Sequence, residues 1–422
     1  MIKRIYAFAV AVLLFGSASA QKSNEQMGGV YYAYPLDVVP ASTSVPSGYR
    51  PFYISHYGRH GSRWLPDEAR YKWVNSRFAD KRNLTPLGRR VRRQLRQVWK
   101  NARGHGGQLT PLGEWQHRSL AARMLSRYPE VFQEGAKIEA RSSVVNRCRA
   151  SMHAFCAELE KKRRTMARLY ASEKHFPSPL LHLFVGNIQI TDSADMAWMA
   201  FTSDEERQLE AQVRPRCEAS GARLMASLFR DPACIEEPDR LMSELFTIAS
   251  DMQDVQLPIN LYDIFTHEEM RALYAQNNRR MWICNGLAPE NNAIPQLSAV
   301  SLWQNIEQRA DEAIARGGTG ADLRFGHDTS LYRLLSLMGM DLLSSECPDR
   351  MDEIVPMAAN LQMVFCSNGQ NVIVLFRHNE REVRLAGLAP TAGSSPASPY
   401  YDWAAVKEHV RRRIADAERR CH

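Results

Sequence analysis

Residues Arg59-His-Gly-Ser-Arg63 follow, after one glycine, the apolar stretch Pro51-Phe-Tyr-Ile-Ser-His-Tyr57, which predicts a β-strand that ends near this point. Two arginines therefore lie on either side of one histidine just past a strand end. An arginine side chain presents a planar set of donors that fits phosphate oxygens, and a neutral imidazole can attack phosphorus without a separate base. The segment indicates phosphoryl transfer through a phosphohistidine.

A second histidine occupies a similar place far along the chain, in Asp322-Leu-Arg-Phe-Gly-His-Asp-Thr-Ser-Leu331. Apolar residues alternate before this histidine as in a short strand, and recur at helical spacing after it. His327 and Asp328 should therefore lie where a strand meets a helix, with Thr329 as a candidate N-cap. The free amides and the dipole at a helix start favour an anion there. We expect the two histidine segments to form one pocket.

These segments resemble the histidine acid phosphatase family, the secreted branch of the histidine phosphatases that includes phytases and multiple inositol polyphosphate phosphatases. The resemblance covers most of the chain after residue 20. It also uses Gly107–His117, which is similar to the family's helix after the first loop. Residues Ile138–Ser143 and Asn146–Ser151 are similar to the family's segment that carries a third phosphate-binding arginine, here Arg141.

The resemblance implies a role for each candidate site residue: His60 as nucleophile, Asp328 as proton donor, and Arg59, Arg63, Arg141 and His327 as ligands of the phosphate. The chemistry requires these residue types. Arginines stabilise the charge on the transferring phosphoryl group, and a poor alkoxide leaving group needs a proton from an acid. The alternative role of Asp328 is an ordinary helix N-cap. Neither a metal ion nor another cofactor is expected.

The first 20 residues predict a signal peptide. Lys3 and Arg4 precede an apolar run over residues 5–15, and Ala18-Ser-Ala20 stands before Gln21. Cleavage would leave 422 minus 20, or 402, residues, and the net charge would fall from +8 to +6 because the leader carries two basic and no acidic residues. No later apolar run reaches the ~18 residues that span a bilayer. We expect a protein exported to the periplasm or beyond the cell, without membrane insertion.

The basic excess suits an anionic phosphorylated small molecule as substrate, through long-range attraction. Much of it lies in the run Arg89–Lys100, where apolar residues recur at helical spacing. This pattern predicts an amphipathic helix with a solvated basic face. A nucleic-acid site is not expected, because aromatic residues do not interleave the basic ones before Trp99.

Helical and strand patterns divide the chain. The sequence Leu-Thr-Pro-Leu-Gly occurs at residues 84–88 and 109–113, and Thr as N-cap followed by Pro predicts a helix start at both. Long helical patterns without convincing strands fill residues 176–295, and a strand meander begins at Leu361. The expected fold is an α/β domain of the phosphoglycerate-mutase type, formed by residues 21–145 and 296–422, with a mostly helical second domain inserted at residues 146–295.

Eight cysteines follow the leader, an even number that permits disulfides without assigning them. No Cys-x-x-Cys occurs, so neither a zinc site nor a thiol redox function is supported. His56 and His60 have the spacing of paired zinc ligands, but that spacing converges only on a helix. The oligomeric state stays open.

The substrate also stays open. Multiple inositol polyphosphate phosphatases commonly carry His-Ala-Glu in the second motif, whereas this chain has His327-Asp328 like the acid phosphatases and many phytases. Export and the basic balance favour phytate or related inositol polyphosphates. A broad acid phosphatase acting on small monoesters, a phosphoglycerate mutase and a non-catalytic phosphate-ester binding protein are the alternatives.

Overall fold

The computed structural model describes residues 22–37, 44–133, 135–172, 188–190, 196, 202–212, 220–343, 350–395 and 397–421. The predicted signal peptide lies outside these residues. Within them, eight strands form one mixed sheet in the order β3-β2-β4-β1-β5-β6-β7, and β8 pairs with β6. The strands are β1(Arg50–Arg59), β2(Lys137–Ser142), β3(Gln189–Ile190), β4(Gly320–Gly326), β5(Asn360–Ser367), β6(Val372–His378), β7(Arg381–Glu382) and β8(Tyr400–Asp402).

The sheet joins a parallel half to an antiparallel half. β3, β2, β4 and β1 are parallel neighbours, while β5 pairs antiparallel with β1 and continues into the β6 hairpin. Because β1 and β4 are adjacent and parallel, their carboxyl ends lie at the same edge. The predicted strands before both histidines are confirmed, and so is the meander from Leu361, which β5, β6 and β7 form.

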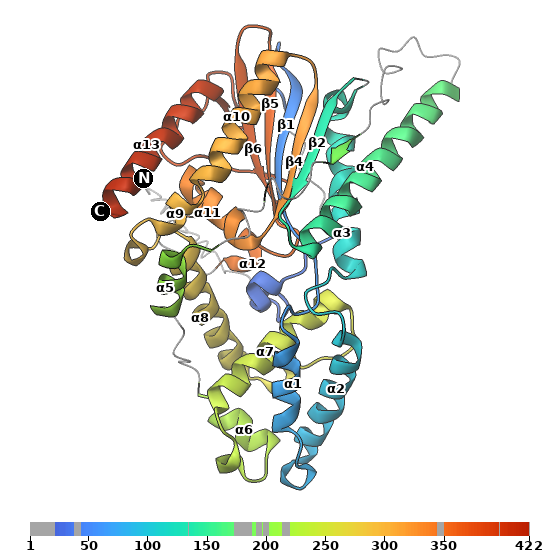
Figure 1. Cartoon of the computed structure of the whole chain (residues 1–422), viewed down its shortest axis with the longest axis vertical. Coiled ribbons are helices and arrows are strands. Elements are labelled where there is room, and N and C mark those ends of the chain that lie inside the picture. The colour runs from blue at the N-terminus through green and yellow to red at the C-terminus, as the bar shows by residue number, and fades with distance from the viewer. Residues whose placement is uncertain are drawn as a thin grey trace, which may run out of the picture.

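Helices cover both faces of the sheet (Figure 1). One face packs against α3(Pro111–Arg127) and α4(Asn146–Ser172), whose apolar side chains share a core with Ile54 and Leu323. The other face packs against α10(Val300–Arg316), α11(Asp328–Met338) and α13(Trp403–Cys421). The remaining short elements near this layer are α5(Asp204–Gln212), α9(Ile294–Ser298) and α12(Met351–Ile354).

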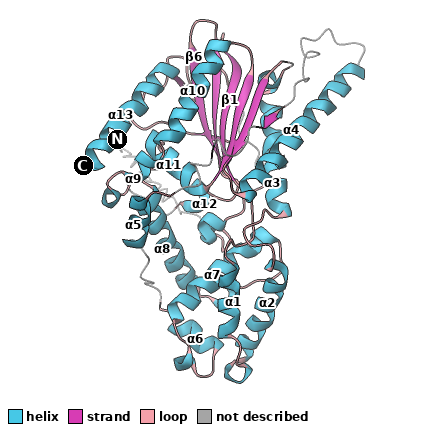
Figure 2. Ribbon diagram, in the orientation of Figure 1, coloured by secondary structure: helices cyan, strands magenta, loops and turns pink. Residues whose placement is uncertain are grey.

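A separate unit contains only helices and loops and lies below the carboxyl edge of the sheet, as Figure 2 shows. Its helices are α1(Glu68–Arg77), α2(Pro86–Ala102), α6(Ala222–Leu228), α7(Pro238–Val255) and α8(His267–Asn285). Short 3-10 helices connect the elements: η1(Gln26–Tyr31), η2(Lys81–Asn83), η3(Pro129–Phe132), η6(Pro232–Cys234), η7(Tyr262–Ile264) and η8(Pro289–Asn291).

The α/β fold class predicted from the sequence is confirmed, but the predicted domain boundaries need correction. α1 and α2, which were assigned to the α/β domain, share the core of the helical unit, where Val91 and Leu95 pack with Leu224 and Leu245. α4, which was assigned to the insertion, packs on the sheet instead. The strand β3 also falls in the stretch expected to be helical. An apolar stripe predicts that one side of a helix is buried, but it does not identify the element that packs against that side.

Both predicted helix starts are confirmed. The hydroxyl of Thr85 accepts from the Gly88 amide at 3.0 Å and that of Thr110 accepts from the Gly113 amide at 3.2 Å, each with Pro at the first helical position. The six cysteines in the described part are free thiols. None of the described helices is long and apolar enough to cross a membrane.

Candidate active site

The two histidine segments meet at the carboxyl edge of the sheet. Arg59, the last residue of β1, pairs in register with Gly326 at the end of β4. The amide of His60 donates to the Gly326 carbonyl at 2.9 Å, and the ring centroids of His60 and His327 are 5.9 Å apart. We call residues 59–63 the histidine turn. The expectation that the two segments form one site agrees with this geometry.

Gly61 lets the histidine turn approach the start of α3. A Cβ atom at Gly61 would lie 2.5 Å from the carbonyl oxygen of Gly113, which is backbone and cannot swing away. The Gly61 amide donates to Ser151 Oγ of α4 at 3.1 Å, and the Ser62 amide donates to Gln116 Oε1 of α3 at 2.9 Å. The turn is therefore held on the helices that cover the sheet.

His60 is buried with one ring nitrogen available for chemistry. Its Nδ1 lies 2.9 Å from the Gly61 carbonyl oxygen, and since a carbonyl can only accept, Nδ1 must carry the hydrogen. Nε2 then keeps its lone pair. Burial, followed by the charges of Arg59, Arg147 and Arg63, holds the pKa of His60 well below its usual range. The neutral, nucleophilic form of the imidazole is therefore favoured even in acid.

Arg59 is anchored by backbone carbonyls from both ends of the chain. Its Nη1 donates to Val30 O of η1 at 2.7 Å and to Val355 O, just after α12, at 2.6 Å. Its Nη2 lies 3.0 Å from Oδ2 of Asp328. The guanidinium of Arg63 lies over the ring of Tyr31, 5.2 Å from its centroid.

The structure corrects the prediction for Arg141. Its guanidinium forms ion pairs with Glu139 and with Asp322, the latter at 2.7 Å, in a cluster that Arg309 of α10 completes. These carboxylates neutralise Arg141 and hold it on the α10 face of the sheet. Arg147, in the first turn of α4, lies at the site instead.

Arg147 is the functional residue that the sequence reasoning missed. Its Nη2 is 3.5 Å from Nδ1 of His327, and its charge lowers the pKa of both His327 and His60. The sequence offered one signal for Arg147. It lies in the first turn of the helix that follows the strand, and a side chain there points back toward the carboxyl edge of the sheet. Arg141 lies inside the strand, where its guanidinium pairs with Glu139 of the same strand and Asp322 of β4.

Three guanidinium groups around His60 have donors to spare. The Nε–H groups of Arg59, Arg63 and Arg147 are buried and have no hydrogen-bond partner among the described residues. A buried donor without a partner is costly, so such groups together mark a place for an acceptor. Three neighbouring cations with unpaired, buried N–H groups suit an anion with several oxygens, such as a phosphate.

His327 also lies in this site, as a neutral imidazole that can donate or accept a hydrogen bond. Its Nε2 is 3.1 Å from Ser143 Oγ, a residue that follows β2. Burial, together with the charge of Arg147, lowers the pKa of His327 to about 4. Nδ1 faces Arg147, so the ring and the arginine are held together beside the His60 imidazole.

Asp328 begins α11 and faces Arg59. Burial alone would raise its pKa, but Arg59, His327 and the Thr329 amide lower it to about 2. Its Oδ1 accepts from that amide at 2.9 Å, whereas the N-cap position belongs to His327 rather than to Thr329 as expected. Without a bound anion, Asp328 is an ionised carboxylate.

The sequence matches the family model of the histidine phosphatase superfamily (branch 2) over residues 59–384, more than half of the chain. The chain belongs to this family. It is a phosphatase, and the matched region contains both histidine segments and the whole helical unit.

Solved phosphatases have a similar fold. The multiple inositol polyphosphate phosphatase of Bifidobacterium longum, in complex with inositol hexasulfate, has a TM-score of 0.67 and 17% identity, covering 91% of this chain and 97% of that chain. The phytase from D. castellii has a TM-score of 0.66 and 15% identity, covering 94% and 87%. Hafnia alvei phytase has a TM-score of 0.52 and 15% identity, covering 89% and 99%. No curated protein sequence matches.

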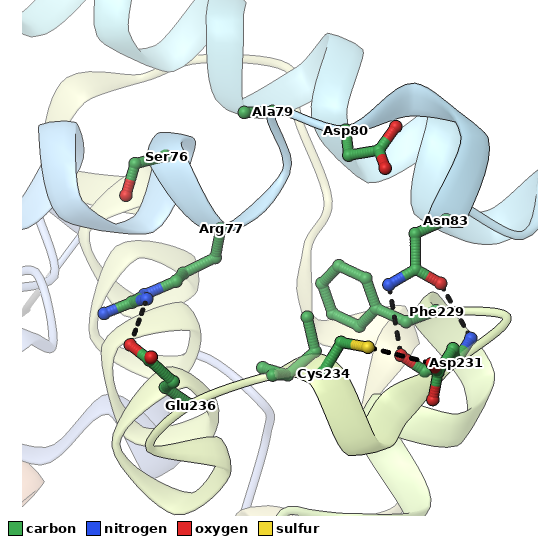
Figure 3. Close-up of a pocket in the computed structure, with 10 residues that line it drawn as sticks. Ser76, Arg77, Ala79, Asp80, Asn83, Phe229, Asp231, Cys234 and Glu236 are labelled. Atoms are coloured by element: carbon green, nitrogen blue, oxygen red, sulfur yellow. Dashed lines mark hydrogen bonds and ion pairs between the residues drawn. The ribbon is translucent and has the colours of Figure 1, made fainter.

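A hollow lies in the helical unit of this phosphatase (Figure 3). It has a volume of about 530 Å³ and lies among α1, η2 and η6. Its arginine, Arg77, is paired with Glu236 at 3.2 Å, and the thiol of Cys234 donates to Asp231 at 2.8 Å. The hollow contains none of the residues at the carboxyl edge and gathers no set of unpaired cations for a phosphate.

Proposed function

We propose that this phosphatase is an exported enzyme that hydrolyses phosphomonoesters through a phosphohistidine, with phytate or a related inositol polyphosphate as its substrate. One observation carries the reaction: the unprotonated Nε2 of His60 lies among three arginines whose buried Nε–H groups find no acceptor in the described part of the chain. An incoming phosphate would satisfy those donors and meet the nucleophile at once.

In the first step, Nε2 of His60 attacks phosphorus and the ester P–O bond breaks. The leaving oxygen takes a proton from Asp328, so an alcohol departs and phosphohistidine remains. In the second step water attacks the phosphorus and gives its proton to the Asp328 carboxylate. Inorganic phosphate leaves and His60 is regenerated. The arginines stabilise the charge on the equatorial oxygens in both steps.

The proton on Asp328 arrives with the substrate. Arg59 holds Asp328 as a carboxylate in the empty site, but a bound phosphate shares the Arg59 charge and its own negative charge disfavours an ionised neighbour. A monoester that enters as the monoanion brings the one proton that the reaction needs, since its second pKa is ~6. Turnover should therefore be greatest in acid.

Two observations support an inositol polyphosphate as the substrate. The Bifidobacterium longum and Hafnia alvei proteins of similar fold were solved with inositol hexasulfate and myo-inositol hexakis sulphate. In this chain, Arg149 is exposed one residue beyond the Arg147–Cys148 pair at the start of α4 and offers a further cation outside the site. The motif His327-Asp328, rather than His-Ala-Glu, keeps a broad acid phosphatase as the second candidate.

The predicted leader supports export. Sequencing of the amino terminus of the protein recovered outside the cytoplasm tests this part, and a start at Gln21 is the expected result. A protein retained in the cytoplasm with residues 1–20 attached would overturn it.

The activity is tested by phosphate release from phytate and from a small monoester at acidic pH. His60→Ala should abolish release from both, while His153→Ala, which removes an exposed imidazole from α4, should keep it. Faster release from phytate supports the proposal, and faster release from the monoester replaces it with a broad acid phosphatase. If neither ester releases phosphate, the remaining alternative is a non-catalytic phosphate-ester binding protein.

A further inference from the structure

Two buried carboxyl groups on α7 face the histidine turn from the helical unit. Asp251 and Asp254 are both 0% exposed and, three residues apart, lie on one face of the helix. Ser62 Oγ donates to Oδ1 of Asp254 at 2.6 Å, and the hydroxyl of Tyr71 donates to Oδ2 of Asp251 at 3.2 Å. Oδ1 of Asp251 lies 3.8 Å from Nη1 of Arg63. α7 thus contacts both residues at the end of the turn.

The surroundings do not compensate two negative charges. Arg63 forms an ion pair with Asp251, and Asp254 has no ion pair among the described residues. Oδ1 of Asp251 and Oδ2 of Asp254 have no hydrogen-bond partner in the same part of the chain. Burial raises the pKa of Asp251 to about 7, and burial followed by the charge of Asp251 raises that of Asp254 well above its usual range. Neighbouring buried carboxyls of this kind retain a proton between them.

We propose that Asp251 and Asp254 are positioning residues that hold the Ser62–Arg63 end of the histidine turn, and that they do so as a pair sharing one proton. Neither residue touches the phosphate. Ser62 is also held through its amide by Gln116 and through its carbonyl by the Thr110 amide at 2.9 Å. The carboxyl pair adds the contact that ties the turn to the helical unit and directs Arg63 to the anion.

The pair should make phosphate binding sensitive to alkali. When the shared proton is lost, the second buried charge repels the first, which disfavours the arrangement in which both carboxyls contact the histidine turn. The charged and titratable groups that face the pair are Arg59 from the end of β1, Arg63 from the histidine turn, Tyr71 from α1 and Tyr262 from η7, and Tyr31 from η1 lies against Arg63. Tyr71 and Tyr262 are neutral in this range because burial raises the pKa of each above its ordinary value.

Binding of inorganic phosphate to the full chain, followed by calorimetry, tests the proposal directly. Asp254→Ala should weaken binding at least tenfold, and Asp254→Asn, which keeps the acceptor for Ser62 without a charge, should recover most of that loss. In Asp254→Asn the decline of binding with rising pH should begin at higher pH than in the parent. The titration of inorganic phosphate itself is the same for both proteins, so it cancels in this comparison. Asp263→Asn, which removes an exposed carboxylate from the same helical unit, is the control and should bind as the parent does.

The outcomes separate this proposal, which rests on the proposed function, from that function itself. Folded Asp254→Ala that binds phosphate within twofold of the parent would overturn the positioning role, and an unchanged pH profile in Asp254→Asn would overturn the shared proton. If Asp254→Ala does not fold, Ser62→Ala removes the same hydrogen bond with a smaller change and should weaken binding in the same direction. A parent that binds phosphate but hydrolyses no ester would refute the proposed function alone.

Discussion

His56 should limit the stability of the protein in acid. It lies on β1 with its side chain 1% exposed, and its ring is stacked on Phe155 at 5.3 Å and near Phe325 at 5.7 Å. Neither ring nitrogen has a hydrogen-bond partner among the described residues. Burial, then the nearby His117 and Arg324, lowers the pKa of His56 from 6.5 to about 3. The folded protein therefore holds this imidazole neutral where the unfolded chain protonates it.

The sign and size follow from linkage. Between pH 6.5 and the folded pKa of about 3, the unfolded state binds one more proton than the folded state, so stability falls as the pH falls. At about pH 4.5 the loss from His56 is two pH units at ~1.36 kcal/mol each, or about 2.7 kcal/mol. That is a large part of a typical folding free energy of ~5–15 kcal/mol.

The variant His56→Leu removes the ionisable group and keeps an apolar side chain of similar size. Urea titrations at about pH 7 and about pH 4.5 give the free energy of unfolding at each pH. The fall between them should be smaller in His56→Leu than in the parent by about 2.7 kcal/mol. His153→Leu, at the exposed histidine of α4, supplies the reference for loss of an imidazole. Equal falls in the parent and His56→Leu would refute the reasoning.

Three further predictions concern the site. Arg147→Ala should lower kcat/KM on the order of 10²–10³-fold. Arg141→Ala should keep kcat/KM within about fivefold, but it should lower the unfolding free energy by up to about 3 kcal/mol because it leaves its partner carboxylates without their cation. Kinetics and urea titration of both variants decide which arginine binds phosphate. Asp328→Asn should slow alkyl phosphates by ~10²–10⁴ and activated aryl phosphates far less, and equal losses would make Asp328 structural. Gly61→Ala should cost about 1–3 kcal/mol of stability and most of the activity, because its Cβ meets the Gly113 carbonyl oxygen at 2.5 Å; parent-like turnover would contradict the close approach.

The sequence predicts the fold where local patterns are strong. The strands before His60 and His327, the Thr-Pro helix starts and the hairpin after residue 360 each depend on neighbours in the chain, and the structure has them. The helical unit could not be assembled in that way. α2 joins α6 and α7 through contacts between segments more than 100 residues apart, which its amphipathic stripe does not specify.

The same limit explains the misplaced arginine. Arg141 and Arg147 are both arginines near the end of β2, and only the positions of Glu139, Asp322 and Arg309 separate their roles. Those carboxylates lie on β2 and β4, and Arg309 lies on α10. In the sheet, Arg141 is paired with Arg324. This register places Arg141, and not Arg147, beside the carboxylates that neutralise it.

The charges at the site explain why this phosphatase should favour acid although Asp328 is ionised when the site is empty. Arg59, Arg63 and Arg147 contribute three positive charges, Asp328 removes one, and the proposed Asp251–Asp254 pair with its shared proton removes another. Burial lowers the pKa of His327 to about 4 and holds that of His60 well below its usual range, so both imidazoles are counted as neutral. These groups together carry one net positive charge. A phosphate monoanion neutralises it, while a dianion leaves one buried negative charge uncompensated, which is costly. The complex should thus take up a proton as a dianion binds, and Asp328, between the phosphate and Arg59, is where that proton is needed.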